Sequence, residues 1–505
     1  MSPLLVVFVV LGIGLLALLA WDLFQKQHAI LRNFPLIGHL RYLLESIGPE
    51  IRQYFIAQND EERPFSRDER RWVYTSAKKS NNYFGFGTDD DLEGGRQHLI
   101  IRHAAFPKEI GKLAKPESAT PHEGKLLWDA RPNEYPLPVS KVLGEARNRK
   151  HAVQMPSAVN ISAMSFGSLS ATAVEAMNRG CAISGAWHNT GEGGIGPHHD
   201  HGGELIWQIG TGYFGCRNEQ GNFDLDRFLA TIERFPVRAV EIKLSQGAKP
   251  GLGGVLPAAK ITPEIAEIRG IPMGEDCRSP ARHRAFSDVD SMLDFVERLG
   301  DASGLPIGIK SAVGEFRFWH QLADAMEDGA RGVDFITIDG GEGGTGAAPL
   351  SFSDHVGLPF RDAMAQVYPV FAERGIQDRF VFKGAGKLGF PDAALLAFAL
   401  GCDAINVGRE AMLAVGCIQA QVCHSGKCPT GVATQRKWLM RGLDPEDKGA
   451  RCANYLAILR KELLALARAC GVDHPSEITL EDFLILDGHG GRRSALDVYG
   501  YESAW

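Results

Sequence analysis

The sequence lacks several features that mark other classes of protein. Its 54 Lys and Arg are outnumbered by 61 Asp and Glu, and no long basic run is interleaved with aromatic residues. This balance argues against nucleic acid as a partner, because polyanion binding relies on an excess of cations. Nine cysteines in 505 residues are too few for a disulfide framework. With 44% hydrophobic residues, the chain has enough apolar material for one large domain and smaller attachments.

The first segment lacks charge altogether. Residues 3–21, PLLVVFVVLGIGLLALLAW, are long enough to cross a bilayer as one helix. A cleaved signal peptide is the alternative, but no Lys or Arg precedes the apolar run, which is also longer than a usual signal core. Lys26, Arg32 and Arg41 follow the span, and the positive-inside bias then places the rest of the chain in the cytoplasm. We expect a single-pass anchor in the cytoplasmic membrane.

Four parts are predicted along the chain. Residues 1–25 form the anchor, and residues 26–110 form a juxtamembrane helical region in which LIGHLRYLLESIGPEIRQYF suggests an amphipathic helix. Residues 111–475 form the main domain, and residues 476–505 are a C-terminal tail.

In the main domain, short apolar runs alternate with helical patterns. The runs AVNISAM, AWHNTGE, LIWQIG, AVEIKL, PIGIKSA, FITIDG, FVFKGA and AINVGR begin near 158, 186, 205, 239, 306, 335, 380 and 404. Helical patterns such as SATAVEAMNRG and DVDSMLDFVERLG separate several of them. Buried parallel strands alternating with helices predict an α/β fold, and eight units of this kind predict a (β/α)8 TIM barrel. Binding residues should then follow the strands.

A glycine pattern, GAGKLG at 384–389, lies between the seventh predicted strand and the helix PDAALLAFALG. In a Rossmann unit it would bind a dinucleotide, but in a barrel the loops after strands seven and eight form a phosphate site. Gly384 and Gly386 would let backbone N–H groups approach a phosphate, while Gly408 and Arg409 end the eighth strand, where a guanidinium can neutralise it. The pattern favours FMN, with tight turns alone as the alternative.

Three cysteines follow the last predicted strand and its helix. Cys417, Cys423 and Cys428 have the spacing C-x5-C-x4-C, and thiolates are the ligands of iron–sulfur clusters. Three cysteines without an evident fourth suit a 3Fe–4S cluster. A zinc ion with His424 as fourth ligand and buried thiols without a metal are the alternatives.

Five segments together resemble the successive signatures of the synthase domain of glutamate synthase. They are SAMSFGSL at 162–169, NTGEGG at 189–194, IKLSQGAKPGLGG at 242–254, DGGEGGTGAAPL at 339–350 and GCIQAQVCHSGKCPTGVATQ at 416–435. The resemblance implies an FMN-binding barrel with a 3Fe–4S cluster. It also implies an oxidoreductase acting on CH–NH2 groups, which reduces 2-iminoglutarate, formed from 2-oxoglutarate and ammonia, to glutamate. Electrons would come from a separate donor, such as ferredoxin or an NAD(P)H-oxidising subunit.

The fourth predicted strand ends in residues suited to a dicarboxylate. Lys243 and Lys249 flank Gln246, and two ammonium groups can hold two carboxylates, although most lysines are solvated surface charges. By resemblance, Glu192 would orient or protonate the imine. The resemblance also implies four flavin-site residues: Met164 and Ser165 facing the ring, Lys310 near its N1 side, and Gln208.

The sequence departs from the family pattern in two respects. A glutaminase region with its catalytic cysteine has no counterpart here, so we expect a stand-alone, membrane-anchored form that takes ammonia or an amine from elsewhere. Near the pocket, Tyr213 stands where an arginine is usual, and PARHRA at 280–285 introduces Arg282 and Arg284. These changes leave open an amine-transferring subunit like that of N-methylglutamate synthase. A non-catalytic electron-transfer subunit is a separate alternative, against which the QGAKPG loop argues, because a relay needs no substrate lysines.

Overall fold

The computed structural model describes residues 2–25, 27–88, 90, 92, 97–109 and 129–502. They form two units, Met1–Glu69 and Arg70–Trp505. The predicted limits at residues 110 and 475 do not separate these units, and the predicted start of the main domain at residue 111 lies outside the described residues, as does Lys26.

The smaller unit is helical. It comprises α1 (Pro3–Phe24), α2 (Ala29–Asn33), α3 (Gly38–Ile51) and the π-helical turn Arg52–Ile56. Ser2 caps α1 by accepting a hydrogen bond from the N–H of Leu5, and Pro3 occupies the first turn, where its missing N–H needs no partner. By length and composition, α1 can cross a membrane. The predicted amphipathic helix is present as α3.

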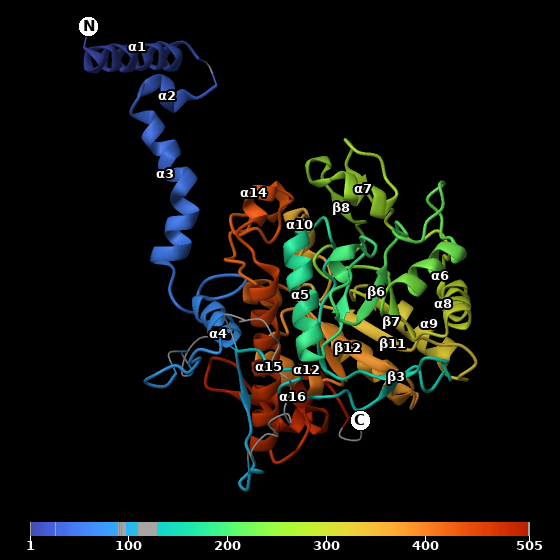
Figure 1. Ribbon diagram of the computed structural model, residues 1–505. Helices are drawn as coiled ribbons and strands as arrows, with labels where there is room; N and C mark the ends of the chain where they lie inside the picture. The colour runs from blue at the N-terminus through green and yellow to red at the C-terminus, as the bar shows by residue number, and fades with distance from the viewer. Residues whose placement is uncertain are drawn as a thin grey trace. The chain divides into compact units, whose positions relative to one another are not determined.

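The larger unit is built on a closed barrel of eight parallel strands (Figure 1). The strands are β4 (Val159–Ile161), β5 (His188–Asn189), β6 (Leu205–Ile209), β7 (Val237–Lys243), β10 (Ile307–Ser311), β11 (Phe335–Asp339), β12 (Val381–Ala385) and β13 (Ala404–Val407). Each pairs with the next, and β13 closes the barrel on β4 with Ile405 opposite Val159. Each predicted run supplies one strand, so the predicted TIM barrel is confirmed.

Helices follow most of the barrel strands. They include α5 (Ala171–Ser184), α6 (Leu225–Arg234), α8 (Val289–Ser303), α9 (Arg317–Met326), α11 (Phe360–Ala372), α12 (Pro391–Ala399), α13 (Arg409–Ala414) and α15 (Pro445–Ala469). Their ends carry the expected caps: the Asp288 carboxylate accepts the N–H of Ser291 at 2.8 Å, and Gly304 ends α8 with φ +71°. The long helix α15 packs along α5, as Figure 1 shows.

Shorter elements extend both ends of the barrel. Near its carboxyl end lie β8 (Val255–Leu256), α7 (Pro263–Arg269), β9 (Cys277–Arg278), α10 (Leu350–His355) and α14 (Lys437–Met440), most of them at the top of Figure 1. A sheet joins β1 (His98–Ile101) to β14 (Phe483–Leu486) and β15 (Arg492–Ser494), so much of the predicted tail is ordered structure. The remaining elements are α4 (Arg67–Ala77), β2 (Val142–Leu143), β3 (Val153–Gln154) and α16 (Ala495–Tyr499).

Candidate active site

A cavity lies at the carboxyl ends of the barrel strands. This is the end at which TIM barrels carry their active sites, because the loops after all eight strands converge there. The structure brings most of the predicted site residues into its lining: Met164, Ser165, Glu192, Gln208, Lys243, Gln246, Lys249, Lys310, Gly386, Gly408, Arg409 and Cys423. Three other predicted residues, Gly384, Cys417 and Cys428, lie outside the lining.

An ion pair stands on one wall of the cavity. Lys243 Nζ donates hydrogen bonds to Glu192 Oε1 at 2.9 Å and to Gln246 Oε1 at 3.1 Å. A Cβ at Gly210 would lie 2.5 Å from one Glu192 oxygen, and a Cβ at Gly254 would lie 2.6 Å from the other, so only glycine fits against this carboxylate. Burial alone would raise the pKa of Glu192, but the charge and hydrogen bond of Lys243 outweigh it and the pKa is lowered. Glu192 is therefore an anion at neutral pH.

Lys249 differs from Lys243 because it forms no ion pair with a carboxylate among the described residues, although the charge of Glu192 acts on it from a distance. Its Nζ donates to the carbonyl oxygen of Ala347 at 3.1 Å, and it makes no ion pair with any residue that the structure describes. Burial and the neighbouring charge of Lys243 together lower the pKa of Lys249. A buried ammonium of this kind gains most from an incoming carboxylate.

The floor of the cavity is a polar network inside the barrel. Lys310 Nζ pairs with Asp339 Oδ2 at 3.0 Å. Burial alone would lower the pKa of Lys310, but the Asp339 carboxylate outweighs it and the pKa is raised. The Glu241 carboxylate accepts hydrogen bonds from Gln208 Nε2 at 2.6 Å and Thr337 Oγ1 at 2.7 Å. Sequence reasoning missed Glu241 and Asp339, although a charge within a buried strand such as AVEIKL is a usable signal.

The loops after β12 and β13 form the opposite side of the cavity. Gly386 has φ +132°, and a Cβ there would lie 3.2 Å from the Cα of Gly340, so the turn requires glycine. A Cβ at Gly384 would lie 2.8 Å from the ring of Phe360 in the core, and the predicted phosphate role of Gly384 stays a prediction. The Arg409 guanidinium donates to the carbonyl oxygen of Glu342. In the part of the chain that the structure describes, the buried Oδ1 of Asn406 has no hydrogen-bond partner.

The cysteine loop borders the cavity through Cys423. Burial would raise the pKa of Cys428, but the backbone N–H groups of Thr430, Val432 and Ala433 point to its sulfur and lower the pKa. Burial raises the pKa of Cys417 to about 12, and the charges of the other two thiols add to that shift. Among the described residues, no three His, Cys, Asp or Glu side chains are close enough to hold a single metal ion.

The two positions that depart from the family pattern lie outside the cavity lining. Tyr213 is fully buried, and its hydroxyl accepts the N–H groups of Arg284 and Ala285, each at 3.1 Å. The same hydroxyl is 3.1 Å from His283 Nδ1, and its one proton is directed there. His283 Nε2 therefore carries the ring proton and donates it to the carbonyl oxygen of Lys243 at 2.9 Å. Arg282 is exposed, so neither Tyr213 nor Arg282 shapes the pocket directly.

Residues 117–473 match the family model described as the conserved region in glutamate synthase. The chain belongs to this family. It is 38% identical to a glutamate synthase large subunit-like protein of Bacillus subtilis, over 95% of this chain and 96% of that protein. It is 35% identical to an archaeal-type glutamate synthase (NADPH) of Thermotoga maritima, over 62% of this chain and 59% of that protein. A flavocytochrome b2 variant with pyruvate bound covers 93% of this chain and 90% of its own, with 14% identity and a TM-score of 0.43.

Proposed function

We propose that this chain is an FMN- and iron–sulfur-dependent oxidoreductase that reduces 2-iminoglutarate to glutamate with electrons from a separate donor. One observation carries the proposal. A single cavity is lined by the strand-end residues predicted for a flavin, by the two lysines predicted for a dicarboxylate and by Cys423 of the cysteine loop. Membership of the glutamate synthase family supports the same reaction class.

The lining fits FMN. Gly386, Gly408 and Arg409 offer a glycine-walled, cationic end for one phosphate, and Met164, Ser165 and Lys310 would lie along the ring. The orphaned Oδ1 of Asn406 is an acceptor that a ring N–H can satisfy. When bound, the flavin supplies hydride transfer.

The wall of the cavity fits an iminium dicarboxylate. Lys249 would bind one carboxylate, because it brings a buried positive charge without an acidic partner among the described residues. Glu192, as an anion, would stabilise the positive charge of the protonated imine nitrogen rather than protonate it. Lys243 holds Glu192 and Gln246 in place and can donate a hydrogen bond to the second carboxylate. Charge is thus matched at both ends of the substrate.

The cysteine loop would hold the cluster through Cys417, Cys423 and Cys428. Ligands of a cluster bind different iron atoms, so their sulfurs stand farther apart than those around one ion. Cys423 and Cys428 are near enough to Cys417 to raise its pKa, which supports a shared site for the three sulfurs. The amide N–H groups around Cys428 stabilise a thiolate. The cluster supplies single-electron transfer when bound.

We propose a location in the cytoplasmic membrane on the basis of α1. Its length and apolar composition support a single membrane span, with the catalytic unit in the cytoplasm, where 2-oxoglutarate and a soluble electron donor are available.

Anaerobic reoxidation tests the function. Purified full-length protein is reduced chemically and mixed with 2-oxoglutarate and either ammonium or methylamine, while the flavin absorbance is followed. We expect FMN, not FAD, on acid release, and reoxidation that requires both the keto acid and an amine. Release of one FAD per chain, or reoxidation that is the same without 2-oxoglutarate, contradicts the proposal. Faster reoxidation with methylamine than with ammonium would instead indicate an N-alkylated product.

A further inference from the structure

The helix α3 carries an apolar face that is exposed among the described residues of its own unit. Ile37, Leu40, Leu44 and Ile47 lie three or four residues apart, so they share one side of the helix. Their exposed fractions are between 40% and 77%. In water such a face is unfavourable, because large apolar side chains gain free energy when they leave water.

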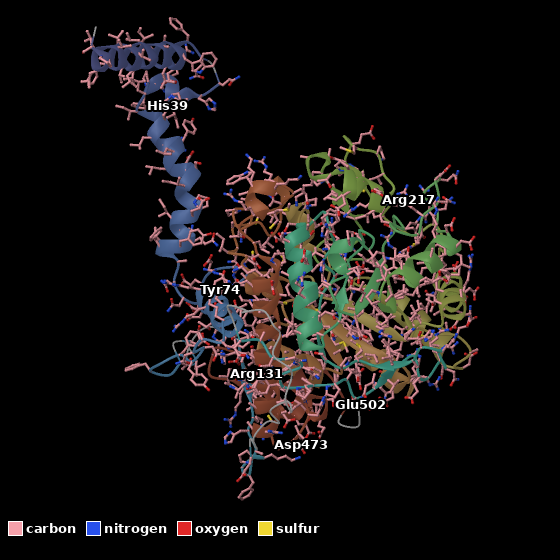
Figure 2. The ribbon with its side chains drawn as sticks, viewed as in Figure 1. His39, Tyr74, Arg131, Arg217, Asp473 and Glu502 are labelled. Atoms are coloured by element: carbon pink, nitrogen blue, oxygen red, sulfur yellow. The ribbon has the colours of Figure 1, made fainter. Side chains whose placement is uncertain are left out.

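A buried carboxylate at the end of α1 fixes where α3 begins. Asp22, in the last turn of α1, is fully buried. One of its oxygens accepts the N–H of Leu36 at 2.9 Å, and the other lies 2.9 Å from Nε2 of His39 in the first turn of α3. Figure 2 labels His39 at this junction. A carboxylate that is hydrogen-bonded both to the backbone and to an imidazole holds the junction in one geometry.

Further contacts stiffen the same turn. The side chain of Gln25 donates to the carbonyl oxygen of His28 and accepts its N–H, both at 2.7 Å. The ring of His28 packs edge-on against Tyr42 of α3, with centroids 5.5 Å apart. With these contacts in place, α3 runs across the axis of α1 and does not continue it, as Figure 1 shows.

We propose that α3 is an interfacial helix, which lies in the plane of the membrane surface with Ile37, Leu40, Leu44 and Ile47 in the acyl boundary. The inference rests on the proposed anchoring by α1. If α1 stands along the bilayer normal, a helix that crosses it lies parallel to the surface, where an amphipathic helix gains apolar burial. Trp21, near the end of α1, is 68% exposed and has the ring chemistry of an interfacial anchor.

Site-directed photo-crosslinking of the full-length protein in phosphatidylcholine–phosphatidylglycerol nanodiscs tests the inference. The photoreactive residue p-benzoylphenylalanine replaces Leu44 on the apolar face, or Ser46, which is exposed on the opposite side of α3 and serves as the matched control. A third variant carries it in place of Leu11 inside α1. Mass spectrometry identifies what each position is joined to. We expect lipid adducts at positions 11 and 44, with about tenfold less at position 46.

Each outcome decides the matter. Lipid adducts at position 11 without an excess at position 44 over position 46 would leave the anchor standing and overturn the interfacial helix. Adducts from position 44 to protein, either a second copy or the chain's own larger unit, would make the face a protein interface. Absence of lipid adducts at position 11 would contradict the proposed membrane anchor, and the proposed interfacial helix would fall with it. An unchanged melting temperature in each variant shows that the fold is intact.

Discussion

The two ends of the cavity are built differently. At the proposed substrate end, Lys243 already bonds Glu192 and Gln246 at 2.9 and 3.1 Å. At the other end, Gln419 and Gln421 of the cysteine loop have φ values of +58° and +55°, a conformation that costs a non-glycine residue about 1 to 2 kcal/mol.

This difference indicates which part of the site depends on a bound ligand for its structure. The substrate end is complete as a set of protein contacts, so it can be formed before substrate arrives. The cysteine loop combines left-handed residues with three cysteines whose thiolate forms repel one another, and a bound metal cluster would offset both costs. Perturbing the loop should therefore remove a whole cofactor, whereas perturbing the substrate end should change only affinities and rates.

The largest expected effect is on the cysteine loop. Replacing Cys417, Cys423 or Cys428 with serine should abolish bound iron and acid-labile sulfide, because a hydroxyl is a poor ligand for a cluster. Metal and sulfide analysis of anaerobically purified protein measures this. The Cys402→Ser variant is the matched control, since Cys402 is buried and lies in the chain between α12 and β13, outside residues 417–428. Equal iron in all four variants would mean that the loop holds no cluster.

The next effect is at Lys249. Its replacement by alanine should leave a substrate carboxylate poorly paired in a partly desolvated pocket, at a cost of roughly 2 to 4 kcal/mol. This corresponds to a loss of about thirty- to a thousand-fold in the second-order rate constant for flavin reoxidation by 2-oxoglutarate. Stopped-flow measurement on chemically reduced protein gives this constant.

A flavin measurement and a control variant make the Lys249 experiment specific. Flavin content should stay normal, because Lys249 follows β7, whereas the predicted phosphate site follows β12 and β13. The Lys150→Ala variant removes an exposed lysine from the same unit and should match the parent. A Lys249→Ala variant that reoxidises at the parental rate would exclude the proposed carboxylate contact.

A smaller effect is expected at the phosphate end. Gly386→Ala places a Cβ at a φ of +132° and 3.2 Å from Gly340, which should shift the turn at a cost of about 1 to 2 kcal/mol. The dissociation constant for FMN should rise about five- to thirty-fold, as measured by fluorescence titration of protein stripped of flavin. Gly346→Ala is the control, since Gly346 lines the same cavity and a Cβ there meets nothing within 4 Å. If both variants lose FMN affinity to a similar extent, the conformation of the Gly386 turn is not what determines FMN binding.

The barrel could be predicted from the sequence because its signal is local. Each of the eight apolar runs is bounded by polar or glycine-rich residues, and each supplies one strand. The placement of Lys243 and Lys249 in the cavity follows from the same rule, since residues after parallel strands converge at one end of a barrel.

Other features depend on contacts between distant segments, which the sequence does not display. Gly384 and Gly386 belong to one glycine pattern, yet one faces the core and the other the cavity, because Gly384 lies within β12 whereas Gly386 lies in the turn after it, with φ +132°. Tyr213 acts through His283 on the backbone of Lys243, although 70 residues separate Tyr213 from His283. Among the described residues, Lys243 has a carboxylate partner and Lys249 does not, because Glu192, which belongs to another loop, bonds Lys243.

That unequal pairing predicts a pH dependence. Burial and the charge of Lys243 lower the pKa of Lys249, so its ammonium loses its proton at a lower pH than an ordinary lysine. Because only the protonated form binds a carboxylate well, affinity for 2-oxoglutarate should be full below this pKa and fall by about tenfold per pH unit above it. The Lys249→Arg variant should bind somewhat less well at neutral pH but keep its affinity into the alkaline range, since a guanidinium stays charged. Calorimetric titration of oxidised protein with 2-oxoglutarate, from neutral to alkaline pH, measures both curves. Parallel curves for parent and variant would assign the alkaline loss to another group and leave Lys249 without its proposed role.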